Sequence, residues 1–344
     1  MKPVNLINKR VGNDNPCYFI AEIGSMFKTF DEAKNLIDSA IKINVDAIKF
    51  QTFRADTITT KQNQFDLSVT GHVSQYEFFK SLELSKELQQ QIVNYANDKG
   101  ITIFSAPSHI DDLNIMKQLD LPIYKIGGDL ACHIPLLKEV AKLDKPIILS
   151  TGMCTLDEVR DSVDTIISTG NDQLILLHCV SDYPAKSSEA NLCAIQTMKN
   201  EFDLPVGFSD HTPGILTSLT ASIMGANVIE RHFKDERNPS YPDDMHALSP
   251  NDFSNLISSI REAELSKGNG IKIPSISEQH NLLSNRVSIV ALKDIHKDEI
   301  ITSDAIDIRR PGTGLSPKYF DQIIGQKAKI NIISGSPIVW DVLL

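Results

Sequence analysis

Short apolar runs, each ending in a polar residue, recur along this chain. The eight run ends are Glu22, Gln51, Ser105, Lys125, Ser150, His178, Ser209 and His232. Between the runs, apolar residues recur at the three- to four-residue spacing that is typical of amphipathic helices. Alternating strands and helices of this number predict an α/β fold, a closed (β/α)8 TIM barrel whose carboxyl strand ends surround one common site.

The pattern changes beyond Glu264, first to polar sequence interrupted by glycine and proline and then to short β-like stretches. We expect a barrel domain over residues 1–266, a linker over 267–284 and a small β-rich domain over 285–344. The β-like stretches are Arg286–Leu292, Ile300–Thr302, Ile306–Arg309 and Lys329–Ile333. Since so small a domain buries little core of its own, we expect it to dock on another surface.

The composition limits the partners. A formal net charge of −10 disfavours nucleic acid and anionic membranes, because both are polyanions, although local lysines can still attract an anionic substrate. The apolar runs are too short to span a bilayer, and the N-terminal sequence lacks the apolar core of a secretion signal. The five cysteines form no Cys-x-x-Cys pair, so we expect free thiols in a cytoplasmic protein.

Lysines and serines end several of the runs. Because side chains alternate across a strand, Lys49, Lys125 and Ser150 are expected to face the barrel interior. With Ser209 they form a candidate cradle for a phosphate and a carboxylate. Each alone could be a solvated rim residue or a structural hydrogen-bonding partner. The convergence of several polar groups at this end of a barrel favours a site.

Two histidines follow the last two strands. His211 and His232 would lie on neighbouring strand ends, where two imidazoles can share one divalent ion and leave positions open for water and substrate. Alternation also places Leu176 and His178 on the inward face, so His178 could add a third ligand or support the site from behind. For His246 a role stays open.

Glu22 ends the first run, on the side that we expect to lie opposite the metal. A carboxylate there could move protons on a reacting hydroxyl or aldehyde oxygen. The simpler role is an ion pair with Lys49 or Lys125, and the two roles are compatible.

Characteristic motifs occur in order along nearly the whole chain. They are Phe19–Gly24, Ile48–Thr52, Tyr124–Gly127, Ser150–Met153, Leu177–Cys179, Tyr183–Pro184, Ser209–Thr212, Glu230–Phe233, Lys293–Thr302 and Arg309–Gly314. The motifs of the barrel resemble those of the sialic acid (nonulosonic acid) synthase family. The last two resemble the antifreeze-like (SAF) domain of the same family.

This resemblance implies a chemistry. The family condenses phosphoenolpyruvate with the open-chain aldehyde of an N-acylated hexose and releases phosphate, which makes it a C–C bond-forming transferase. The roles implied by motif are catalysis by Glu22 and His232, binding of Mn²⁺ or Mg²⁺ by His211 and His232, phosphoenolpyruvate binding by Lys49, Lys125, Ser150 and Ser209, and sugar binding by Gln51, Tyr183, Asp243 and Arg310. Arg310 is expected to reach the N-acyl group in a partner subunit's barrel, so the resemblance also implies a domain-swapped homodimer.

The chain departs from the family pattern at several positions, mainly in the sugar half. Met26 and Phe27 replace an Asn-His pair, Ala106 replaces a threonine, Gly128 replaces a serine and Leu130 replaces an acidic residue. Lost hydroxyl and carboxylate contacts favour a substrate without the matching hydroxyls. We therefore expect either N-acetylmannosamine or a 2,4-diacetamido-trideoxyhexose as the acceptor, with the second better suited to the substitutions.

Other readings stay open. Another phosphoenolpyruvate-dependent aldol-type synthase could act on a sugar phosphate, for which Arg54 and Arg310 are available cations. A catalytically degenerate sugar-binding paralogue would also fit the substitutions. The joint presence of the lysines, the histidines and Glu22 disfavours it. An ice-binding role for the small domain explains Arg310 less well than a substrate-capping role does.

Overall fold

A computed structural model describes residues 2–7, 9–67 and 71–344 of the chain. The chain divides into two compact units, Met1–Gly268 and Asn269–Leu344. Within the residues that are described, none of the helices is long and apolar enough to cross a membrane.

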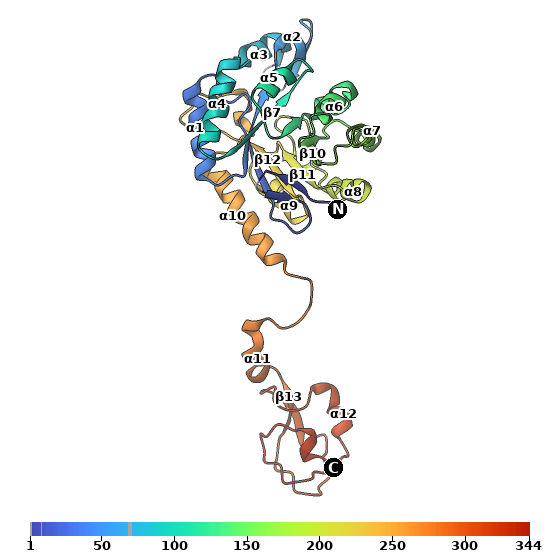
Figure 1. The fold of residues 1–344 in the computed structure, drawn as a ribbon. Coiled ribbons are helices and arrows are strands. Elements are labelled where there is room, and N and C mark those ends of the chain that lie inside the picture. Colours follow the sequence, from blue (N-terminus) through green and yellow to red (C-terminus); the bar gives the residue numbers. More distant parts are fainter. Residues whose placement is uncertain (1, 8, 68–70) are drawn as a thin grey trace. The chain divides into compact units, whose positions relative to one another are not determined.

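Eight parallel strands close a barrel in the first unit (Figure 1). They are β3 (Tyr18–Glu22), β4 (Ala47–Thr52), β7 (Thr102–Pro107), β8 (Tyr124–Ile126), β9 (Ile147–Ser150), β10 (Leu174–Cys179), β11 (Val206–Asp210) and β12 (Val228–His232). Neighbours in the barrel follow chain order, and β12 pairs with β3 to complete the ring. The predicted TIM barrel is confirmed.

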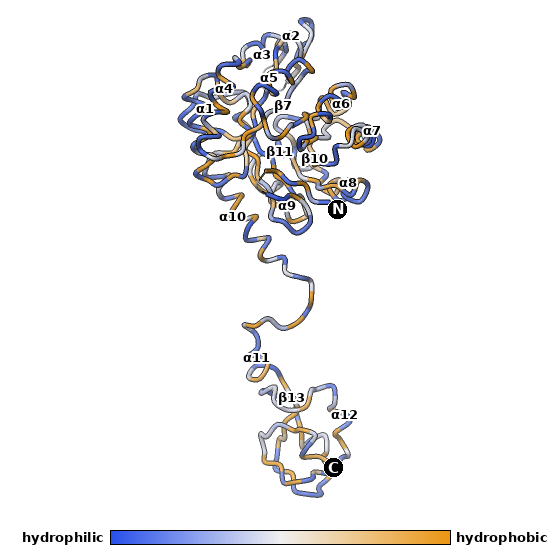
Figure 2. The backbone as a smooth tube through the Cα atoms, viewed as in Figure 1, coloured by the Kyte–Doolittle hydropathy of each residue, from blue (hydrophilic) through white to orange (hydrophobic). Residues whose placement is uncertain are grey.

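Helices surround the barrel and connect its strands (Figure 1). They are α1 (Phe30–Lys42), α4 (Lys86–Asp98), α5 (Asp112–Gln118), α6 (Ile134–Ala141), α7 (Leu156–Ile167), α8 (Cys193–Phe202), α9 (Leu216–Ile223) and α10 (Pro250–Lys267). Capping boxes at Thr29 and Thr155 satisfy the first backbone N–H groups of α1 and α7. Hydropathy alternates along the turns of these helices (Figure 2), because one face of each packs against the outside of the barrel.

A separate apolar cluster fills the barrel interior. Its strand residues include Ile20, Phe104, Ile148 and Val228, and it is joined by residues of the N-terminal hairpin of β1 (Val4–Leu6) and β2 (Lys9–Val11). The hairpin residues in the cluster are Val4, Leu6 and Val11. The hairpin thus packs at the amino ends of the strands, which leaves the polar groups at the carboxyl ends.

The connection between β4 and α4 contains regular structure. The short helix α2 (Ala55–Ile58), a hairpin of β5 (Gln64–Leu67) and β6 (Gly71–Ser74), and α3 (Gln75–Leu82) occupy it. Phe65 of the hairpin makes edge contacts with Phe78 and Phe79 of α3. Residues 68–70 of this connection lie outside the described residues.

The second unit contains a two-stranded antiparallel sheet of β13 (Ser288–Ala291) and β14 (Ile306–Arg309). Short helical elements complete it: η4 (Ile276–Glu278), α11 (Gln279–Ser284), η5 (Pro317–Tyr319), α12 (Phe320–Ile323) and η6 (Trp340–Val342). The predictions of strands at 300–302 and 329–333 were wrong. Only isolated bridges form there, such as Ile300 with Lys327, because each segment makes a single pairing contact before the chain turns.

Candidate active site

Four charged side chains meet inside the barrel near the carboxyl ends of the strands. Lys49 Nζ lies 2.5 Å from Glu22 Oε2 and 3.1 Å from Glu230 Oε1. Lys125 Nζ lies 3.6 Å from the same oxygen of Glu230. All four side chains are buried. Two ammonium groups and two carboxylates therefore balance one another in an environment where an unpaired charge would be costly.

Two hydroxyls complete this network. Lys125 Nζ donates a hydrogen bond to Ser150 Oγ over 2.6 Å, and Ser209 Oγ donates one to Glu230 Oε1 over 3.0 Å. The four residues of the predicted phosphoenolpyruvate cradle are thus brought together, and Glu230 joins them. Sequence reasoning gave Glu230 no role. Its place two residues before His232 on one strand was the signal that could have identified it.

Burial and mutual attraction set the charge states of this network. Burial lowers the pKa of Lys49 to about 8. Burial by itself would raise the pKa of Glu230, but the ammonium groups of Lys125 and Lys49 outweigh it and lower that pKa to about 2. Glu230 therefore stays ionised at neutral pH, and Lys49 begins to lose its proton at a pH just above neutral.

Glu22 lies beside the histidines and not opposite to them. Because the barrel closes by pairing its first strand with its last, Glu22 is the register partner of His232. The expectation of an opposite position was wrong, and the expected ion pair with Lys49 is present. Glu22 Oε1 also accepts the backbone N–H of Gly24 and lies 3.5 Å from Gln51 Nε2. A Cβ at Gly24 would meet this oxygen and the Gln51 side chain, so a larger residue there would displace both side chains.

The two predicted metal-binding histidines lie close together. His211 follows β11, His232 ends β12, and their ring centroids are 5.5 Å apart. His211 Nδ1 donates to the Val180 carbonyl over 2.8 Å, which leaves Nε2 free to accept or to bind a metal. Burial lowers the pKa of His211 to about 4 and that of His232 well below its usual value. Both imidazoles are therefore neutral at neutral pH, as metal ligation requires.

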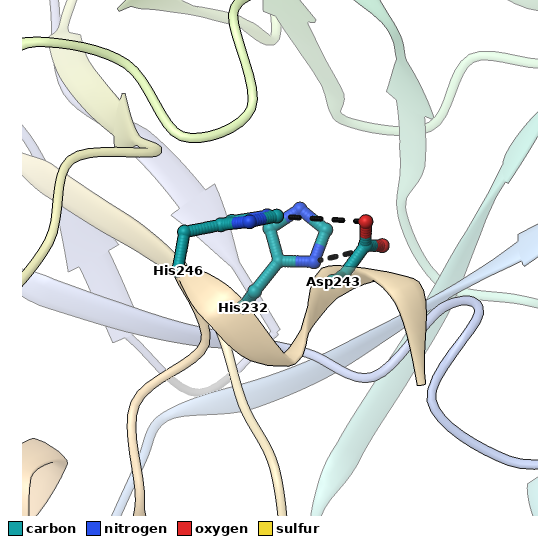
Figure 3. Close-up of side chains that lie close together, drawn as sticks. All are labelled: His232, Asp243 and His246. Atoms are coloured by element: carbon teal, nitrogen blue, oxygen red, sulfur yellow. Dashed lines mark ion pairs between the residues drawn. The ribbon is translucent and has the colours of Figure 1, made fainter. Parts of the chain in front are cut away.

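Two of the predicted sugar-binding residues border these histidines. Tyr183 has its ring centroid 4.4 Å from that of His211. Asp243, in the turn η3 (Pro242–Met245), has Oδ2 3.4 Å from His232 Nδ1 (Figure 3). Burial, with a further contribution from Asp244, raises the pKa of Asp243 to about 7.

The donor set fits a divalent cation. One potential ligand atom from each of His232, Asp243 and His246 lies within 4.8 Å of the others. Both imidazoles point toward the Asp243 carboxylate (Figure 3). His232 Nδ1 is buried and has no hydrogen-bond partner within residues 2–7, 9–67 and 71–344. Imidazole and carboxylate donors suit several divalent ions and do not by themselves select one.

His178 does not face the site. Its Nε2 lies 2.8 Å from the Ala190 carbonyl and its ring stacks on Phe208, outside the barrel wall. The inward residues of β10 are Ile175 and Leu177, so the predicted inward pair of Leu176 and His178 was wrong by one residue. Arg310 belongs to the second unit, where it is exposed.

The substituted positions have mostly structural surroundings. Met26 and Phe27 are buried in the apolar layer between the barrel and its helices, and Leu130 packs against the same layer. A Cβ at Gly128 would lie 2.8 Å from the backbone nitrogen of Gly152, so the two loops approach backbone to backbone. Packing thus accounts for Met26, Phe27 and Gly128 without a contact to substrate.

Comparison with known proteins identifies the class to which this barrel and its site belong. The NeuB family matches residues 36–272, and the SAF domain matches residues 286–344. The chain therefore belongs to the NeuB family, and the predicted resemblance is confirmed.

Individual relatives match nearly the full length. An N,N'-diacetyllegionaminic acid synthase of Legionella pneumophila is 37% identical, over 99% of this chain and 98% of the relative. A pseudaminic acid synthase of Campylobacter jejuni is 32% identical, over 96% of this chain and 98% of the relative. The crystal structure of an N-acetylneuraminic acid synthetase from Leptospira borgpetersenii has a TM-score of 0.74 at 29% identity, and the match covers 82% of this chain and 95% of that one.

Proposed function

We propose that the protein condenses phosphoenolpyruvate with an N-acylated hexose to give a nonulosonic acid and phosphate. The observation that carries this proposal is the buried network of Lys49, Lys125 and Glu230 directly beside the histidine cluster. The network supplies donors for a phosphorylated acid, and the neighbouring imidazoles supply ligands for a cation. Membership of the NeuB family supports the same conclusion.

Binding of phosphoenolpyruvate is assigned to the donors of the network. The ammonium groups of Lys49 and Lys125 and the hydroxyls of Ser150 and Ser209 donate to its phosphate and carboxylate oxygens. Hydrogen bonds between charged groups are roughly twice as strong as neutral ones, so the lysines dominate the affinity. Glu230 holds both ammonium groups on one side of the barrel interior, which orients them before the substrate arrives.

The reaction forms one C–C bond and breaks one C–O bond. C3 of phosphoenolpyruvate attacks the aldehyde carbon, water adds at C2, and the bond from C2 to the phosphate oxygen breaks. A Mn²⁺ or Mg²⁺ ion held by His211 and His232 would polarise the aldehyde and orient the water. Glu22 lies beside His232, where its carboxylate would accept a proton from the attacking water and pass it to the aldehyde oxygen as that becomes a hydroxyl, and Lys49 holds this carboxylate in position.

The sugar is assigned to the outer side of the histidines. Tyr183 and Asp243 border that side, and Gln51 lies beside Glu22. The partner subunit's Arg310 is proposed to bind the N-acyl group in a domain-swapped homodimer. We propose a 2,4-diacetamido-trideoxyhexose as the preferred acceptor over N-acetylmannosamine. Relatives named as diacetyllegionaminic and pseudaminic acid synthases support this preference.

A phosphorylated acceptor is less well supported. It would require a free cation near the sugar, and Arg54 already pairs with Asp111 at 3.2 Å.

Phosphate release tests the proposal directly. The purified protein, phosphoenolpyruvate and Mn²⁺ are combined with a panel of N-acylated hexoses and sugar phosphates, and the product is identified by mass spectrometry. We expect release with the diacetamido sugar and much slower release in Lys125→Met at low phosphoenolpyruvate concentration, while the exposed Lys142→Met serves as the matched control. Release with none of the sugars, although the metal is bound, would mean that the chain is a degenerate binding protein.

A further inference from the structure

His246 is a buried imidazole that the proposed reaction does not use. It follows the turn η3, and only 2% of its surface is exposed. Neither Nδ1 nor Nε2 has a hydrogen-bond partner in the part of the chain that the structure describes. A buried polar group without a partner costs free energy, so two unpartnered nitrogens on one ring indicate that a ligand is to be bound there.

The surroundings of His246 are those of a metal ligand. Its ring centroid lies 4.6 Å from that of His232 and 5.9 Å from that of His211. Its Nε2 is 4.0 Å from Asp243 Oδ1 (Figure 3). Three imidazoles that bind one ion at about 2.1 Å have ring centroids about 5 Å apart. The separation between His246 and His232 is close to this value, and the separations of 5.5 and 5.9 Å between His211 and these two rings are larger. The ligand atoms that lie within 4.8 Å of one another are those of His232, Asp243 and His246.

Arg231 positions the backbone beside all three histidines. It directly precedes His232, and its Nη2 donates to the carbonyl of Thr212 over 2.8 Å and to that of His246 over 3.0 Å. Thr212 directly follows His211. Arg231 Nη1 also lies 2.5 Å from Asp210 Oδ2, and this ion pair has no solvent exposure. One guanidinium thus ties together the segments that carry the three rings, which restricts their movement relative to one another.

We propose that His246 supplies a third imidazole to the cation assigned to His211 and His232, so that the site is a three-histidine centre with Asp243 at its edge. This inference rests on the proposed function for the location of the ion and adds a ligand and a metal preference. Nitrogen donors favour Co²⁺, Zn²⁺ and Fe²⁺ over Mg²⁺, which prefers oxygen. The site therefore binds these borderline ions more tightly than a two-histidine site does.

Metal titration of the substrate-free protein tests the third ligand. The full chain is stripped with a chelator and titrated with Co²⁺, followed by calorimetry and by the visible absorption of the bound ion. In His246→Gln we expect the Co²⁺ affinity to fall by at least about 10-fold, with a changed absorption spectrum and a much smaller change for Mg²⁺. The matched control is His178→Gln, because His178 is bonded outside the barrel wall and should not affect the titration.

A second measurement needs no variant. Pulsed electron paramagnetic resonance of the wild-type protein loaded with Cu²⁺ counts the coordinated imidazoles, and we expect three. A count of two, or an unchanged Co²⁺ affinity and spectrum in His246→Gln, would overturn the inference and leave the proposed synthase activity intact. Three coordinated imidazoles in a protein that releases no phosphate with any sugar would support the inference and refute the proposed function.

Discussion

The ion pair between Arg231 and Asp210 offers the sharpest test of how the site is held together. Both side chains have 0% exposure. Replacing Arg231 by methionine removes this pair and the two bonds to the Thr212 and His246 carbonyls, and it leaves the Asp210 carboxylate buried without its counter-ion. Breaking one side of such a pair costs about 3–5 kcal/mol of the free energy of unfolding.

A double-mutant cycle separates the ion pair from its wider role. In Asp210→Asn/Arg231→Met neither charge remains, and the neutral pair costs much less than the sum of the single variants. We expect a coupling free energy of about 2 kcal/mol or more between the two positions. Metal affinity should stay low in both Arg231→Met and the double variant, because neither ties the carbonyls of Thr212 and His246 together.

Urea denaturation, followed by the far-ultraviolet circular dichroism of the helices, measures these free energies. The circular dichroism transition should move to lower urea in Arg231→Met than in the wild-type protein. A loss below about 1 kcal/mol, or additive effects in the double variant, would refute the reasoning.

Three further predictions concern the substrate side of the site. The affinity for phosphoenolpyruvate should fall as the pH rises through about 8, because Lys49 then loses its charge. The same depressed pKa affects stability, because the unfolded chain binds more protons than the folded chain between about pH 8 and 10.5. The free energy of unfolding should therefore rise with pH in that window. Substrate binding and urea denaturation across this pH range measure the two effects. In Lys125→Met the KM for phosphoenolpyruvate should rise by about 10- to 150-fold, because a charge-assisted hydrogen bond contributes about 1.5–3 kcal/mol. Steady-state assays measure this KM, and an unchanged value would contradict the role of Lys125. Gly128→Ser should lower the free energy of unfolding by about 1–3 kcal/mol, since its Cβ would lie 2.8 Å from the backbone nitrogen of Gly152. Thermal denaturation of this variant and of the wild-type protein checks the expectation.

The alternation of side chains along a strand predicted the inward face correctly on strands in which a polar residue stands among apolar ones. Lys49 and Lys125 stand among apolar neighbours, so the side that they face could be inferred. On β10 the residues before His178 are all leucine or isoleucine and are buried on both faces. A strand of this kind has no alternation to read, and the inward side was therefore assigned wrongly.

The remaining features depend on tertiary contacts that single-sequence patterns do not carry. Glu22 and His232 are neighbours only because the barrel closes on itself. His246 reaches the site because the Arg231 guanidinium binds the carbonyls of two separate loops. The strand ends that the sequence marked could thus be predicted, whereas the place of His246 beside the other histidines required the fold.

The packing of the β1–β2 hairpin predicts an order of substrate binding for the proposed reaction. With the amino end of the barrel packed by this hairpin, both reactants must enter and leave past the histidines. Glu230, which holds the lysines, precedes His232 by two residues and so lies about 6–7 Å further from the entrance. The substrate that binds at the inner position, beside the lysines, must bind first, and it cannot leave while the second substrate is bound. Phosphoenolpyruvate should therefore be the leading substrate of a compulsory sequence, with phosphate departing last.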